Sequence, residues 1–119
     1  MNDNKSTTRF GRITPPNEDW LNRAPAEPVI DPDLAIVDTH HHLGDHPSRY
    51  SYLLPEFLSD VETGHNLTQT VFVQCHAMYR ADGPKELRCV GETEFVAGIA
   101  AMSESGIYGD TRVAAGIVG

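Results

Sequence analysis

The sequence predicts an α/β fold whose elements follow the order strand–helix–strand–helix–strand. Three short segments are apolar almost without interruption, and a segment with helical periodicity separates each from the next. Continuous apolar strands are typical of parallel sheets, and strand–helix–strand units join parallel neighbours through right-handed crossovers. The 119 residues leave room for one domain at most.

The three apolar segments are the expected strands, and they span residues 34–38, 69–75 and 112–118. The second is rich in β-branched and aromatic residues, which favour strands. The first follows Pro32, which fits an extended conformation at that point.

Two helices are expected between these strands, at about residues 55–62 and 90–105. Pro55 suits a first helical turn, and Gly64 and Gly106 suit positions just beyond a helix end. Apolar side chains recur at spacings of three and four, at Leu54, Phe57, Leu58 and Val61 in the first helix and at Phe95, Val96, Ile99 and Met102 in the second.

Residues 1–33 differ in composition from the rest of the chain. They hold five of the eight prolines among polar residues and show no apolar period, so we expect an extended or disordered arm. Trp20 and Leu21 could pin this arm to a surface. Residues 34–119 would then form three strands and two helices with no helix after the last strand, which favours a truncated larger domain over a small independent one.

Composition and charge exclude several classes of protein. Nine Lys and Arg residues, scattered singly, stand against 17 Asp and Glu and a net charge of −8, which argues against nucleic acid as a partner. No apolar run approaches the roughly 18 residues of a membrane-spanning helix. Cys75 and Cys89 are too few for a disulfide scaffold and are expected to be buried thiols, and without an export signal the predicted location is the cytoplasm.

The strongest chemical signal is the sequence Asp38-Thr39-His40-His41-His42 at the end of the first expected strand. Because strand side chains alternate, His40 and His42 point to one side and His41 to the other. Two imidazoles on one face can bind a single divalent metal ion, zinc above all, at about 2.0–2.1 Å. The carboxyl ends of parallel strands are also where such folds place their active sites. A solvated histidine tract is the alternative.

Residues 36–43, Ile-Val-Asp-Thr-His-His-His-Leu, resemble the opening strand of the amidohydrolase superfamily, whose mark is Asp-x-His-x-His. The similarity is greatest to the amidohydrolase-related group of TIM-barrel metal-dependent hydrolases, which includes sugar-lactone and pyrone-dicarboxylate lactonases and some decarboxylases. The resemblance extends over residues 25–119 and includes the stretches 64–84, 91–96 and 112–119.

The resemblance implies a (β/α)8 barrel of which this chain is the N-terminal part. It implies that His40 and His42 are metal ligands and that His41 has a packing role. The family completes its site with histidines on later strands and an aspartate near the end of the barrel, which would act as general base. Those strands are absent here, so the 119-residue chain alone is expected to be inactive.

The implied reaction is hydrolysis of a lactone, ester or amide bond in a small carboxylated or sugar-derived substrate. Two alternatives stay open: a non-oxidative decarboxylase on the same fold, and a non-catalytic fragment. Some lactonases of the group work without metal, so a metal-independent variant is also open, as is an oligomer of identical chains.

Several residues after the second strand are candidates for substrate binding. We expect them on the same rim as the histidine motif, at the carboxyl ends of the strands. His76 could orient substrate or carry a proton, Arg80 could hold a carboxylate with its planar guanidinium, and Tyr79 lies between them in sequence. His65 precedes the second strand and is expected on the opposite face, with a structural role. The first loop holds His46, for which we expect a role in a turn. The pairs Glu56/Glu62 and Glu92/Glu94 are expected on solvated helix faces.

Overall fold

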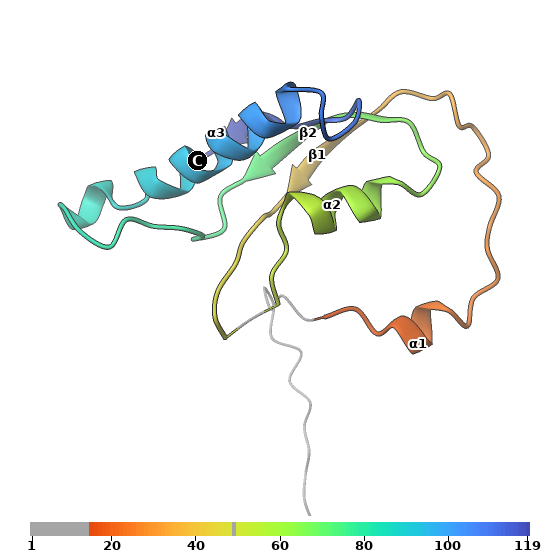
Figure 1. Cartoon of the computed structure of the whole chain (residues 1–119), viewed down its shortest axis with the longest axis horizontal. Helices are drawn as coiled ribbons and strands as arrows, with labels where there is room; N and C mark the ends of the chain where they lie inside the picture. Colours follow the sequence, from red (N-terminus) through yellow and green to blue (C-terminus); the bar gives the residue numbers. More distant parts are fainter. Residues whose placement is uncertain (1–14, 49) are drawn as a thin grey trace, which may run out of the picture.

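The computed structural model describes residues 15–48 and 50–119 and shows an α/β fold with a three-stranded parallel sheet (Figure 1). The predicted order of three strands and two intervening helices is confirmed. The elements are α1 (Glu18–Leu21), β1 (Ile36–His41), α2 (Leu54–Val61), β2 (Leu67–Val73), the 3-10 turn η1 (Lys85–Leu87), α3 (Val90–Glu104) and β3 (Arg112–Val118).

The first two strands are offset from their predicted positions. β1 begins two residues later than expected and runs on through Asp38 to His41, so it includes the first two histidines of the motif. β2 begins and ends two residues earlier than expected, at Leu67 and Val73. In β1 the polar residues Asp38 and His41 pair with Thr70 and Phe72 of β2, which an apolar pattern alone does not reveal.

The two long helices begin and end where their local chemistry favours it. In α2, Pro55 occupies the first turn, where its missing N–H costs nothing, and the Glu56 carboxylate accepts the N–H of Leu53 at 2.9 Å. Beyond α2 and α3, Gly64 and Gly106 adopt φ of 97° and 75°, which glycine tolerates best.

The sheet has the order β1-β2-β3, so β2 is central and pairs in parallel with both neighbours. Its register is irregular twice. Asp38 and His41 of β1 face Thr70 and Phe72 of β2, so three residues of β1 span two of β2. β3 has a similar irregularity opposite Gln69 and Val71, where Ala114 adopts a positive φ of 54°.

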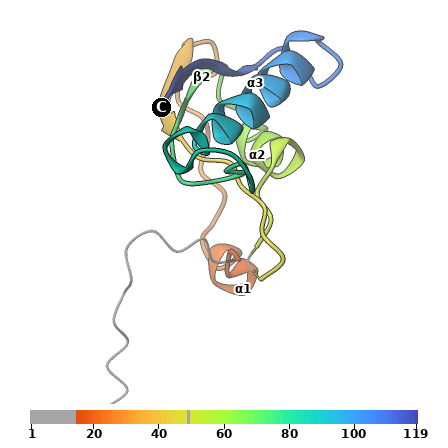
Figure 2. The ribbon, with the colours of Figure 1, turned by 90° about the vertical axis from the view of Figure 1, so that its left-hand side faces the viewer.

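Both α2 and α3 lie on one face of the sheet, as Figure 2 shows. The hydrophobic core fills the space between, from Leu43, Leu54, Phe57, Phe72, Val96, Ile99, Val113 and Ala114. On the opposite face of the sheet, Val37 and Val118 are about half exposed, at 49% and 52%. Within the described residues, the sheet is therefore covered on one face, and β1 and β3 each have one unpaired edge.

The arm preceding the sheet is described from residue 15 onward, and its first 14 residues lie outside the described part. Residues 15–33 contain one short helix, α1, whose first turn is capped by the side chain of Asn17. Trp20 is 65% exposed and Leu21 49%, so neither is buried against the domain. No helix in the described ranges is long and apolar enough to cross a membrane.

Candidate metal and substrate site

His40 and His42 lie at the carboxyl end of β1 with their rings converging. Their Nε2 atoms are 3.3 Å apart, and the ring planes meet at 88°. Nδ1 of His42 lies 2.7 Å from the carbonyl oxygen of Val73 in β2. Since that carbonyl can only accept, Nδ1 of His42 is the donor in this hydrogen bond, and Nε2 of His42 faces Nε2 of His40.

The local irregularity of β1 produces this arrangement. The Asp38 carboxylate accepts the backbone N–H of His40 at 3.0 Å, which takes that N–H out of the strand ladder. The extra residue lies between Asp38 and His41. As a result His41 is buried on the helix-covered side, while His40 and His42 are exposed, as the alternation predicts.

His41 is part of the core, with 7% of its surface exposed. Its ring stacks on Phe57 of α2 at 4.5 Å between centroids, and its Nε2 lies 2.8 Å from the hydroxyl oxygen of Thr70. Burial lowers the pKa of His41 below its ordinary value, and the nearby Asp38 carboxylate opposes that effect. His41 is therefore neutral at pH 7 and has the packing role expected of it.

The pair His40 and His42 fits two positions of a tetrahedral metal site. Two ligands at 2.0–2.1 Å from one tetrahedral ion are about 3.3–3.4 Å apart, which matches the observed separation of the Nε2 atoms. The bond from His42 to a backbone carbonyl is the usual way in which proteins orient a ligating imidazole. In the part of the chain that the structure describes, no group of three or more His, Cys, Asp or Glu side chains could hold a metal ion.

The loop after β2 places two of the three predicted substrate residues against each other. The rings of His76 and Tyr79 lie 5.4 Å apart, and the side-chain amide of Gln74 donates a hydrogen bond to the Tyr79 hydroxyl. His76 and Met78 both adopt positive φ, at 66° and 53°, so the loop turns sharply at each. The side chains of Gln74, His76 and Tyr79 are all exposed and can form hydrogen bonds.

Arg80, the third predicted substrate residue, forms an ion pair with helix α3. Its guanidinium forms a two-pronged ion pair with Glu94 of α3, of which the Nε–Oε2 bond is 3.1 Å. This pairing raises the pKa of Arg80 and lowers the pKa of Glu94. A substrate carboxylate would have to compete with Glu94 for Arg80.

Glu92 is a residue whose position the sequence did not reveal. It was expected on a solvated helix face, but it is only 3% exposed, so that expectation is wrong. Its Oε1 accepts the N–H of Cys75 at 2.8 Å and of Ala77 at 3.0 Å. A negatively charged residue in the first turn of a helix interacts favourably with the helix dipole, and Glu92 lies in the first turn of α3. This position was the available signal in the sequence for a role at this end of the sheet.

The two cysteines differ in their surroundings. Cys89 is exposed at the start of α3, so the expectation that it is buried is wrong. Cys75 is half-buried, and burial, together with the nearby Glu92, raises its pKa to about 11. Cys75 is therefore a protonated thiol at neutral pH, with a packing role rather than a reactive one.

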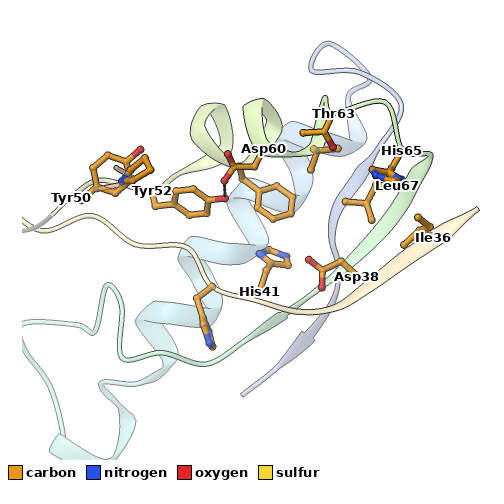
Figure 3. Close-up of a pocket in the computed structure, with 13 residues that line it drawn as sticks. Ile36, Asp38, His41, Tyr50, Tyr52, Asp60, Thr63, His65 and Leu67 are labelled. Atoms are coloured by element: carbon orange, nitrogen blue, oxygen red, sulfur yellow. Dashed lines mark hydrogen bonds between the residues drawn. The ribbon is translucent and has the colours of Figure 1, made fainter. Parts of the chain in front are cut away.

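A groove of about 940 Å³ runs between β1 and α2 on the helix-covered side (Figure 3). Asp38 and His41 border it from β1, and Tyr52 donates a hydrogen bond across it to Asp60 of α2. His65 also borders the groove, immediately before β2 and away from the carboxyl end of the sheet, as expected.

His46 has the turn role expected of it, because its Nδ1 lies 2.9 Å from the hydroxyl oxygen and 3.2 Å from the backbone nitrogen of Ser48. The structure therefore groups the histidines by role. His40 and His42 form a converging pair, His76 lies in the loop after the neighbouring strand, and the other three have local or packing contacts.

The chain was compared with models of protein families, with curated proteins and with solved structures, and none of these comparisons gives a match.

Proposed function

We propose that this chain contributes to a metal-dependent hydrolase of the amidohydrolase type, which opens a lactone, ester or amide bond. On this proposal the described sheet and its two helices are the first part of a (β/α)8 barrel. The uncovered face of the sheet would be the barrel interior, and the unpaired edges of β1 and β3 would pair with further strands.

The observation that carries the proposal is the convergence of His40 and His42. Both residues lie at the carboxyl end of the parallel strand β1, and both side chains are exposed. Their Nε2 atoms have the separation of two ligands on one tetrahedral ion, and Val73 fixes the tautomer of His42.

These two histidines would hold a divalent ion, with zinc best suited to imidazole ligands. When bound, such an ion lowers the pKa of its water and polarises a carbonyl group. The proposal assigns the remaining ligands and the general base to strands beyond β3. The bond from His42 to Val73 holds the imidazole in its ligating orientation.

The rim formed by Gln74, His76 and Tyr79 supports binding of a hydroxylated substrate. These side chains offer hydrogen-bond donors and acceptors, whereas the guanidinium of the third candidate, Arg80, is already paired with Glu94. Sugar-derived lactones carry several hydroxyl groups that such a rim can bind. Of the two substrate classes expected from the sequence, the geometry therefore favours the sugar-derived one over the carboxylated one.

Product analysis on the protein made from its full coding frame tests the reaction. A panel of sugar lactones and aromatic carboxylic acids is offered with zinc, and ring opening and carbon dioxide are measured in parallel. Ring opening that is lost when both His40 and His42 are changed to alanine supports the proposal. Carbon dioxide release without ring opening would replace it with the decarboxylase, and ring opening that survives the double substitution would remove the metal role of these histidines.

A further inference from the structure

We propose that Glu92 is a positioning residue: it fixes the backbone on both sides of His76, and so places the His76 imidazole against Tyr79 on the rim. The inference rests on the proposed function in taking this rim as the place where substrate binds. Its evidence is independent of the metal pair, because it concerns the contact between α3 and the loop after β2.

The Glu92 carboxylate bridges two backbone groups with a single oxygen. Oε1 accepts N–H groups from Cys75 and Ala77, the two neighbours of His76. A nearly fully buried carboxylate needs such donors, and its place in the first turn of α3 adds the favourable field of the helix dipole. The other oxygen, Oε2, has no hydrogen-bond partner among the described residues. All hydrogen bonds of the Glu92 side chain in the described structure are therefore made to this loop.

His76 needs this support because its backbone is in the left-handed region. A φ of 66° is unfavourable for a residue with a β-carbon, and such conformations persist when surrounding contacts hold them. With both neighbouring N–H groups tied to Glu92, the chain turns at His76 and the imidazole lies 5.4 Å from the Tyr79 ring.

Gly91, the residue before Glu92, brings the loop and the helix close together. A β-carbon at position 91 would lie 2.4 Å from the carbonyl oxygen of Met78 and 2.8 Å from the backbone nitrogen of Arg80. The loop backbone therefore rests directly on the helix at the point where the short Glu92 side chain must reach it. Glu94, two residues after Glu92 in the sequence, forms its ion pair with Arg80 on the exposed side of the helix.

The test compares Glu92→Gln and Glu92→Ala in the full 119-residue chain, with Glu94→Gln as a control on the same helical turn. Glutamine keeps an oxygen that can accept both N–H groups, and alanine does not. Amide hydrogen exchange at Cys75 and Ala77 and the nuclear Overhauser effect between the His76 and Tyr79 rings are measured by NMR.

In Glu92→Ala we expect exchange at both amides to accelerate at least tenfold and the ring–ring contact to be lost. Exchange at Phe72 in β2 should stay the same, and Glu92→Gln and Glu94→Gln should behave as the unmodified chain. Unchanged exchange and an unchanged ring contact in Glu92→Ala would overturn the proposal. So would loss of both in Glu94→Gln, because the outer ion pair would then hold the loop.

Two further measurements keep the test decisive. If Glu92→Ala fails to fold, Glu92→Asp takes its place, because its shorter side chain reaches the two N–H groups less well. We then expect the same faster exchange at Cys75 and Ala77 and the same loss of the ring contact. Normal protection of both amides in Glu92→Asp would overturn the proposal. Zinc uptake is measured on each folded variant and should not change. A failure of the metal proposal would appear there, in the unmodified chain, and not in the exchange data.

Discussion

The hydroxyl oxygen of Thr70 lies 2.8 Å from Nε2 of His41 and 2.8 Å from the backbone nitrogen of Ala114. Thr70 is fully buried in the central strand, so this one oxygen links all three strands of the sheet. It accepts the N–H of Ala114 at the point where β3 departs from regular pairing. The contact between Thr70 and His41 keeps the His41 ring in the core. It thereby helps to set the direction in which the neighbouring His40 and His42 side chains point.

Replacing Thr70 by valine should destabilise the fold by about 1–3 kcal/mol. Valine has nearly the same shape but leaves the Ala114 N–H and the His41 ring nitrogen without a partner in a buried place. Urea denaturation measures the loss. Thr93→Val, at an exposed position of α3, is the matched control and should change stability by less than about 0.5 kcal/mol. Equal effects of the two substitutions would refute the bridging role.

Alanine should have opposite effects at two glycines of α3. At Gly91 the new β-carbon would lie 2.4 Å from the Met78 carbonyl oxygen, so we expect a loss of about 1–3 kcal/mol and movement of the loop after β2. At Gly98 an added β-carbon would have no atom within 4 Å beyond its chain neighbours and the backbone of its own helix. The higher helix propensity of alanine should therefore add about 0.5–1 kcal/mol. Thermal denaturation of both variants gives the comparison, and a stabilising Gly91→Ala would contradict the close approach.

Cys75 should be much slower to alkylate than an ordinary thiol, and its rate should keep rising with pH. Burial beside Glu92 raises its pKa to about 11, so only about 0.1% is thiolate at pH 8. In a Cys89→Ser variant, which leaves Cys75 as the one thiol, mass spectrometry follows iodoacetamide labelling from pH 7 to 9.5. We expect about a tenfold increase for each pH unit over this range, whereas a rate that levels off toward pH 9.5 would show an unperturbed thiol.

The alternation and order of the elements could be predicted from the sequence because local patterns determine them. Apolar runs identified the three strands, and periodicity with Pro55 and Gly64 identified α2. β1 begins two residues and ends three residues later than predicted, and β2 begins and ends two residues earlier. Pairing with β2 extends β1 into polar residues such as His41. An apolar pattern contains no information about the neighbour.

The direction of the three histidines was predictable from strand alternation, but the convergence of two of them was not. It depends on the extra residue in β1 and on a carbonyl of β2 that is 31 positions away in sequence. Glu92 and Arg80 show the same limit. Carboxylates on a helix are usually solvated, and only the folded loop brings backbone N–H groups to Glu92 and the Arg80 guanidinium to Glu94.

The most direct test of the metal site is zinc uptake by the 119-residue chain, measured by equilibrium dialysis and elemental analysis. The comparison is between His40→Ala/His42→Ala and the control His46→Ala/His65→Ala, which removes two exposed histidines from outside the pair. Two imidazoles bind a metal ion more weakly than a closed site of four ligands, so dialysis covers a wide range of zinc concentration. We expect uptake near one ion per chain that persists in the control and is lost in His40→Ala/His42→Ala; equal uptake by the two double variants would contradict a metal site at His40 and His42.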